Sequence, residues 1–194
     1  MFHQLGGLGD GAGQEELLAM LLRAHPETTY DYLEFRLIVA AAACRMAAER
    51  ATEDDRGKLT RAYEAVVAAL GRNDPRQAAE ADVHFHLACY EASHNAVMLH
   101  IMRTFFLMLC HDVFYDLRQF YEREGVRQLL LRQHKAILDA ILASDPQAAA
   151  RAAERHIVYT REAVQESRLA GQRLAVAMRR VGRDTLAQVT DRTG

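Results

Sequence analysis

The sequence predicts an all-α fold, an antiparallel bundle of six or seven helices. Apolar residues recur at helical spacing along most of the 194-residue chain, and no segment shows the sustained period-two alternation of half-buried strands. Cap residues and prolines separate the helical stretches, so consecutive helices should pack together through short connections. The low number of prolines, three in all, and the alanine-rich runs also favour helix.

The cap signals set the expected boundaries. Asp31 is expected to cap a long helix that ends near Arg50, and Thr52 with Asp55 resembles a capping box. Asp74 and Asp145 each precede a proline that can occupy a first helical turn. The predicted helices cover residues 14–25, 31–50, 53–71, 75–93, 95–121, 129–143 and 146–171. Residues 1–13 carry five of the 11 glycines and are expected to form a flexible lead-in or linker, and residues 172–194 a helix end and tail.

Composition excludes several classes of protein. Hydrophobic residues make up 50% of the chain and charged residues 26%, which argues against disorder. The net charge of −2 argues against a chain that is one nucleic-acid-binding domain. Cys44, Cys89 and Cys110 lie in apolar surroundings and are expected to be reduced core thiols. With no secretory signal and no membrane-spanning run, we expect a cytoplasmic protein.

Four polar residues carry the spacing expected of a metal site. Asp82 and His86 are four residues apart, so they project from one face of a helix. His134 and His156 each lie 11 residues from Asp145, so they should face each other across a helical hairpin. Three imidazoles and a carboxylate suit a divalent ion such as Zn, Ni, Fe or Mn. The alternative is a half-buried Asp–His pair with two hydrogen-bonded core histidines.

Other histidines have simpler explanations. Glu91 and His94 form one Glu-x-x-His pair, but a diiron bundle needs two such pairs and two further glutamates. His100 and His111 are expected to be surface or hydrogen-bonded groups. Arg36 and Asn95 are polar residues among apolar neighbours, and either could be a surface or capping residue.

Five separated blocks resemble one known family. These blocks are YDYLEFR at 30–36, MAAERAT at 46–52, ADVHFHLACYEASHN at 81–95, RQHKAILDAI at 132–141 and DPQAAARAAERH at 145–156. In this order they resemble the FCD domain, the C-terminal effector domain of FadR-subfamily GntR transcription regulators. The resemblance covers roughly residues 15–170 and is greatest to the lactate-, glycolate- and pyruvate-responsive members.

The resemblance implies an effector-binding domain at 14–171 with a central cavity for a metal ion and a ligand. The family's metal ligands map onto Asp82, His86, His134 and His156, with Zn as the expected ion. A small 2-hydroxy or 2-oxo acid would bind at or beside the ion, and Arg36 and Asn95 would line its pocket. Such a domain would be a homodimer and a ligand sensor, not an enzyme.

Two departures from the family pattern stand out. The first motif usually carries a glutamate where this chain has Ala40. No winged helix-turn-helix precedes Gln14, so DNA would be reached only through a domain outside this chain. One alternative is therefore a stand-alone metal-binding interaction module that modulates a full-length regulator. A metal-dependent enzyme is the weaker alternative, because the one unassigned carboxylate near a ligand, Glu154, lies on another helix face than His156.

Overall fold

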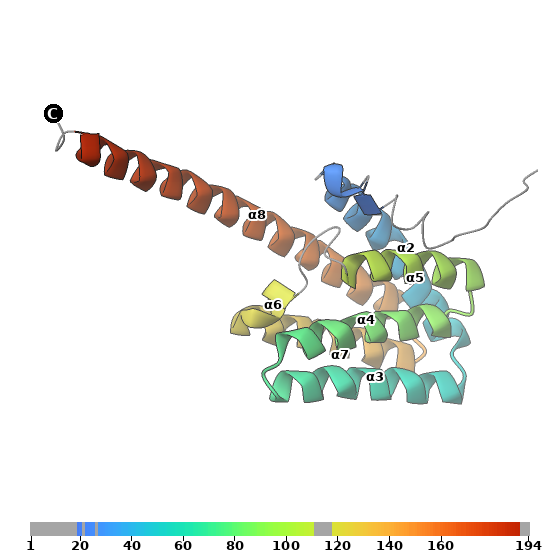
Figure 1. Ribbon diagram of the computed structural model, residues 1–194. Helices are drawn as coiled ribbons and strands as arrows, with labels where there is room; N and C mark the ends of the chain where they lie inside the picture. Colours follow the sequence, from blue (N-terminus) through green and yellow to red (C-terminus); the bar gives the residue numbers. More distant parts are fainter. Residues whose placement is uncertain (1–18, 21, 26, 111–117, 191–194) are drawn as a thin grey trace, which may run out of the picture. The chain divides into compact units, whose positions relative to one another are not determined.

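The computed structural model describes residues 19–20, 22–25, 27–110 and 118–190. Its labelled helices are α2 (Thr28–Arg50), α3 (Glu53–Gly71), α4 (Pro75–Ala92), α5 (Ala96–Cys110), α6 (Arg118–Glu122), α7 (Glu124–Leu142) and α8 (Pro146–Thr190) (Figure 1). Residues 22–24 are also helical, and no strand occurs within the described ranges. The predicted all-α class is confirmed. The lead-in predicted for residues 1–13 lies outside the described residues.

Three tight turns between antiparallel helices share one construction. In each turn the second residue after the helix end has a left-handed backbone, and the residue after that one caps the following helix. The left-handed residues, with φ of 53°, 52° and 53°, are Asn73, His94 and Ser144. The capping side chains, which accept hydrogen bonds from first-turn amides, are Asp74, Asn95 and Asp145. Short turns of this kind place consecutive helices side by side in opposite directions.

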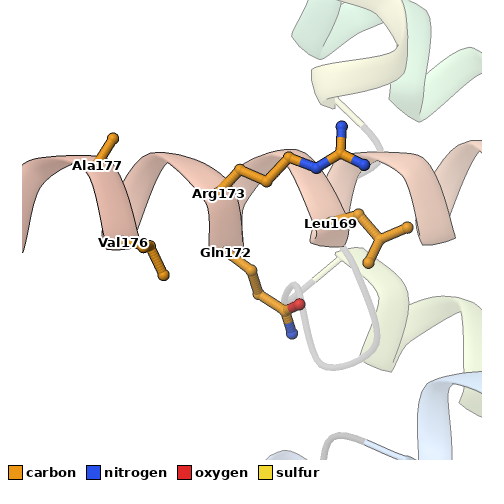
Figure 2. A pocket seen from close by; sticks show the side chains of 5 residues that line it. All are labelled: Leu169, Gln172, Arg173, Val176 and Ala177. Carbon is orange, nitrogen blue, oxygen red and sulfur yellow. The ribbon is translucent and has the colours of Figure 1, made fainter.

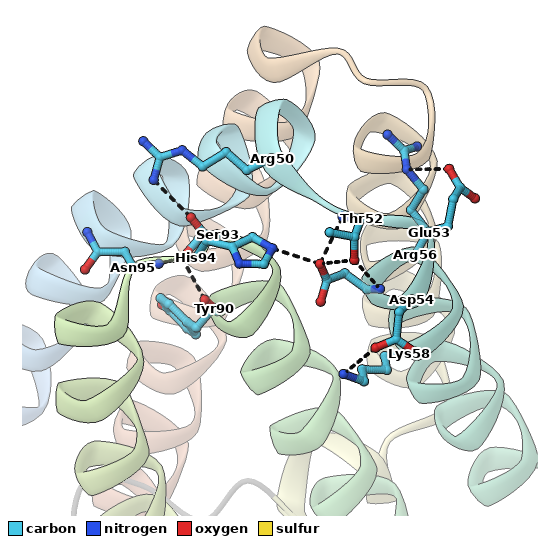
Figure 3. Close-up of polar contacts among 11 residues, drawn as sticks. Arg50, Thr52, Glu53, Asp54, Arg56, Lys58, Tyr90, Ser93, His94 and Asn95 are labelled. Carbon is cyan, nitrogen blue, oxygen red and sulfur yellow. Dashed lines mark hydrogen bonds and ion pairs between the residues drawn. The ribbon is translucent and has the colours of Figure 1, made fainter.

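The start of α3 is tied to two other parts of the bundle. Thr52 and Asp55 form the predicted capping box, since the Asp55 amide donates to Thr52 Oγ1 and the Thr52 amide donates to Asp55 Oδ2. His94 Nε2 lies 2.9 Å from the same carboxylate oxygen, which connects the α4–α5 turn to α3 (Figure 3). Arg56 donates to the Leu142 carbonyl at 2.6 Å and to Ser144 Oγ at 2.8 Å, at the α7–α8 turn.

Helix α4 is the central helix of the bundle. It packs against α2, α3, α5 and α6, while α7 packs against α2, α3 and α6. Figure 1 shows α4 between α3 and α5. Small side chains at the contacts let the helix backbones approach closely. The buried alanines of α2 and α4 are Ala40, Ala43, Ala47, Ala48, Ala78, Ala79, Ala81 and Ala92. Cys44 and Cys89 are buried free thiols, as predicted; the Cys110 side chain is not among those described.

Several predicted boundaries differ from the structure. Helix α2 begins at Thr28, so Asp31 lies in its first turn and is not its cap. The helix predicted over 95–121 comprises α5 and α6, with residues 111–117 outside the described ranges. Helix α7 begins at Glu124, five residues before the predicted start at 129, and Gly125 lies in its first turn. A glycine lowers the stability of a helix only modestly relative to alanine, so it does not prevent the helix from starting before it.

The last helix is longer than predicted. The chain divides into two compact units, residues 1–158 and 159–194, and α8 continues through the second unit to Thr190 instead of ending near Gly171. A single glycine costs a helix only about 1 kcal/mol relative to alanine, and good helix formers flank Gly171 on both sides.

Figure 2 shows side chains on this part of α8, including Leu169, Arg173 and Val176, that line a surface recess of about 400 Å³. The described helices include none with the length and hydropathy needed to cross a bilayer.

Candidate metal centre

Four polar side chains meet in the interior of the bundle. Asp82 and His86 come from α4, His134 from α7 and His156 from α8, and none is more than 4% exposed. One potential ligand atom from each lies within 4.8 Å of the others. The structure therefore brings together all four residues that the spacing singled out. Helix geometry explains the convergence, because a four-residue step keeps Asp82 and His86 on one face and the equal offsets from Asp145 set His134 opposite His156.

The closest atoms in this cluster are those that would ligate an ion. His86 Nε2 and His156 Nε2 are 3.0 Å apart, and His134 Nε2 lies 3.0 Å from Asp82 Oδ1. His86 Nε2 is 3.8 Å from the same carboxylate oxygen. Three imidazole nitrogens and one carboxylate oxygen form a donor set that suits Zn and other borderline divalent ions.

His134 provides the sharpest test of whether an ion fits. Its side chain is fully buried, and neither ring nitrogen has a hydrogen-bond partner among the described residues. The 3.0 Å approach to Asp82 Oδ1 does not have hydrogen-bond geometry. An imidazole buried without a hydrogen bond is costly. A cation bound to Nε2 would give that nitrogen a partner, so the residues present fit a metal ion.

Two further residues orient the ligands from outside the cluster. The Tyr121 hydroxyl donates to Asp82 Oδ1 at 2.7 Å, and Gln133 Oε1 lies 3.2 Å from His156 Nδ1. With the Gln133 oxygen as acceptor, His156 carries its proton on Nδ1 and directs the Nε2 lone pair into the cluster. Sequence reasoning missed both residues. Gln133 could have been found, since it precedes His134 and so lies near His156 across the hairpin, whereas nothing in the sequence marks Tyr121.

Burial and neighbouring charges shift the pKa values of three of the four cluster residues. Burial lowers the pKa of His86 well below its ordinary value, and the nearby Arg36 charge lowers it further. Burial and the charges of His134 and His86 lower the pKa of His156 in the same way. Burial alone would raise the pKa of Asp82, but the adjacent imidazoles outweigh it and the pKa lies far below the ordinary value. Neutral imidazoles and an ionised carboxylate are the protonation states that metals require.

Arg36 lies beside the cluster. Its side chain is 1% exposed, and its guanidinium carbon is 5.2 Å from the centroid of the Phe106 ring. The same ring stacks on His86 at a centroid distance of 6.2 Å. Phe106 therefore connects a buried positive charge to one of the four cluster residues. A guanidinium in this position can attract a carboxylate that approaches the cluster.

Asn95 has the contacts of a helix cap. Its side-chain oxygen accepts a hydrogen bond from the Met98 amide at 3.1 Å, as Asp74 and Asp145 do for their own helices. Its predicted contact with an effector stays a prediction. Glu91 and His94 point to different partners, since Glu91 pairs with Arg103 at 2.6 Å and His94 contacts Asp55.

Comparison with protein families gives a match to the FCD domain over residues 31–159. Two similar relatives come from Escherichia coli K12. The putative L-lactate dehydrogenase operon regulatory protein is 38% identical over 142 residues, which are 73% of this chain and 54% of that protein. The Glc operon transcriptional activator is 31% identical over 160 residues, 81% of this chain and 63% of that protein. The chain thus spans between about half and two thirds of the length of these relatives, both of which are named as regulators.

Solved structures share the same fold. The Listeria monocytogenes protein Lar, described as controlling expression of the agr system, superposes with a TM-score of 0.62 at 17% identity, over 69% of this chain and 61% of that one. A Streptococcus agalactiae GntR protein gives a TM-score of 0.56 at 24% identity, over 70% of this chain and 58% of that one. E. coli McbR/YncC superposes with a TM-score of 0.60 at 18% identity, over 71% of this chain and 65% of that one.

Proposed function

Since the chain belongs to the FCD-domain family of GntR-type transcription regulators, we propose that it is a metal-dependent sensor of a small organic acid. The observation that carries this proposal is the buried group of Asp82, His86, His134 and His156. A buried cluster of three imidazoles and a carboxylate, in which His134 has no hydrogen bond within the described residues, is costly in an apolar core unless an ion occupies it. Zn is the ion that this donor set suits best, with Ni, Mn and Fe as alternatives.

The acid would bind at the edge of the metal centre nearest Arg36. The bound ion supplies Lewis-acid character that attracts a carboxylate or a 2-hydroxy or 2-oxo oxygen. Arg36 supplies a buried guanidinium that can donate two parallel hydrogen bonds to the same carboxylate. The name of one E. coli relative refers to an L-lactate dehydrogenase operon, which supports a 2-hydroxy or 2-oxo monocarboxylate as the effector class.

Effector binding would act on DNA through a second domain. The curated relatives extend well beyond the region that this chain matches, and we propose that the sensor works as a homodimer joined to winged helix-turn-helix domains. An acid that binds one arrangement of the bundle better than another shifts the population toward that arrangement. The coupling between acid and DNA is then reciprocal, so that each changes the affinity for the other by the same factor.

The proposal is tested by thermal unfolding of the metal-loaded chain with L-lactate, glycolate and pyruvate, each with and without a chelator. A ligand that binds only the folded state stabilises it by about 2.7 kcal/mol at a hundredfold excess over its dissociation constant. We expect at least one acid to raise the midpoint and the chelator to abolish the rise.

A pair of histidine variants makes the test specific. His134→Ala should abolish the acid-dependent rise, whereas His100→Ala should retain it because His100 is exposed on α5. If no acid raises the midpoint of the metal-loaded protein, or if the rise survives the chelator, the metal-anchored sensor is the wrong function.

A further inference from the structure

Helix α4 carries a third polar residue in line with two of the cluster residues. Asp82, His86 and Tyr90 follow one another at four-residue steps, so all three project from the same face of α4. Four residues advance a helix by about 6 Å. Tyr90 therefore lies one turn beyond His86 toward the C-terminal end of the helix, and all three side chains are buried.

The Tyr90 hydroxyl is an unusual group for a protein core. Tyr90 is 2% exposed, and within the described part of the chain its hydroxyl has no hydrogen-bond partner. Buried polar groups in native proteins are almost always hydrogen-bonded, because an unpaired one loses its hydration without compensation. Phenylalanine would fill the same space without an unpaired hydroxyl. A tyrosine at this position is therefore favourable only if its hydroxyl binds another molecule.

The surroundings of Tyr90 are those of the proposed acid site. The Tyr90 ring lies 6.1 Å from the Phe106 ring, measured between centroids. The Arg36 guanidinium lies 5.2 Å from that same centroid, and the His86 ring stacks on it. Tyr90, Arg36 and His86 are thus gathered around one aromatic side chain. Burial also raises the pKa of Tyr90, so the hydroxyl keeps its proton and can act as a donor.

We propose that Tyr90 is an effector-binding residue, whose hydroxyl donates a hydrogen bond to the carboxylate of the bound acid beside Arg36. The inference rests on the proposed function, because it assumes that an acid occupies the site. A carboxylate with one oxygen toward the metal centre presents its second oxygen to the neighbouring donors. A phenol and a guanidinium together satisfy more of its lone pairs than the guanidinium alone.

Three tyrosine-to-phenylalanine variants test the assignment, since each removes one oxygen atom and nothing else. Tyr90→Phe removes the proposed contact to the acid, and Tyr121→Phe removes the donor to Asp82. Tyr63→Phe is the matched control, because Tyr63 is a half-buried residue of α3 whose ring packs on Phe85. For each variant we would measure the melting temperature without acid, the affinity for Zn, and the affinities for L-lactate, glycolate and pyruvate.

The expected pattern separates Tyr90 from the other two. Tyr90→Phe should lower the affinity for the acid that the wild type binds by about tenfold or more, as expected for the loss of one hydrogen bond to a charged group. Its affinity for Zn should be unchanged, and its acid-free melting temperature should be equal to or higher than that of the wild type, because an unpaired buried hydroxyl has been removed. Tyr121→Phe should instead lower the affinity for Zn, and Tyr63→Phe should change neither the affinity for Zn nor the affinity for the acid.

The outcomes distinguish this inference from the proposed function. If the wild type binds an acid in a metal-dependent way and Tyr90→Phe binds it equally well, the Tyr90 assignment is overturned and the sensor function stands. If Tyr90→Phe loses acid and Zn affinity together, the residue supports the metal centre and the assignment is likewise overturned. If the wild type binds none of the three acids, the proposed function fails and this inference fails with it.

Discussion

The Nε2 atoms of His86 and His156 lie 3.0 Å apart, although 70 positions separate the two residues in the sequence. The contact joins the central helix α4 to the first turns of α8. Two neutral imidazoles can share one proton in such a contact, but then the nitrogens of His134 remain without hydrogen bonds among the described residues. One cation reached by all three rings accounts for the arrangement of the whole cluster.

Gln133 should control metal affinity without touching the metal. We expect Gln133→Leu to weaken Zn binding by about 10- to 100-fold, because His156 would lose the acceptor that fixes its tautomer and ring orientation. Gln133→Glu should bind Zn at least as tightly as the wild type, since a carboxylate is also an acceptor. Competition against a chromophoric chelator measures both affinities. Gln77→Leu is the matched control, because Gln77 bonds Arg72 at an exposed turn; equal losses in both leucine variants would contradict the prediction.

Asp55 should stabilise the fold in a pH-dependent way. Burial alone would raise the pKa of Asp55, but its hydrogen bonds with Thr52 and His94 lower it below the ordinary value of 3.8. A lowered pKa gives stability that is fully present above the ordinary value and is lost as the pH falls through the folded-state pKa. Asp55→Asn should therefore cost about 1 kcal/mol at pH 7, the typical worth of a helix cap, and progressively less below about pH 4.

The pH effect of Asp55 is measured by urea unfolding of wild type and variant between pH 3 and pH 7. Asp54→Asn serves as the control, since the exposed pair of Asp54 with Lys58 should contribute little at any pH. A difference between wild type and Asp55→Asn that stays constant down to pH 3 would show that the charge of Asp55 plays no part.

Asn95 should behave as a helix cap. Asn95→Ala is expected to lower the free energy of unfolding by about 1 kcal/mol, because the Met98 amide loses its acceptor. Asn95→Asp should keep the stability of the wild type, because Asp74 and Asp145 cap the helices that follow the other two turns. Chemical denaturation measures both, and an alanine variant as stable as the wild type would exclude the capping role. Weaker acid binding by a stable Asn95→Asp variant would show that Asn95 also contacts the effector.

Arg56 should hold the start of α3 to the α7–α8 turn. Its guanidinium reaches the Leu142 carbonyl and Ser144 Oγ at once, and the single ammonium of lysine cannot reproduce that two-point contact. Arg56→Lys is expected to destabilise the fold by about 1 kcal/mol. Arg61→Lys, at an exposed position of the same helix, should change stability little. Unfolding midpoints in urea compare the two, and equal midpoints would contradict the role of Arg56.

The four residues of the buried cluster could be predicted from the sequence because their positions depend on regular helix geometry. A four-residue step places Asp82 and His86 on one helix face whatever surrounds the helix. Equal numbers of residues on either side of the turn at Asp145 set His134 and His156 at one height. The capping box of Thr52 and Asp55 was equally accessible, since its hydrogen bonds are local.

The contacts that the sequence did not reveal depend on packing between distant helices. Tyr121 meets Asp82 across 39 positions, and its approach is set by how the short helix α6 packs on α4. The helix face of Tyr90 can be predicted from the sequence. That its hydroxyl has no hydrogen bond within the described residues can be known only from the packing of the helices around it. The sequence predicts that the last helix ends near residue 171, but α8 continues to Thr190 because the helix formers around Gly171 outweigh the small cost of one glycine.

The most direct measurement is the metal content of the purified chain after loading with Zn, Ni, Mn or Fe and exhaustive dialysis. We expect about one equivalent of ion per chain in the wild type and in His100→Ala, and none in His134→Ala, with circular dichroism showing that both variants remain helical. A wild type that retains no ion, or a folded His134→Ala variant that retains as much as the wild type, would contradict the metal centre on which the account rests.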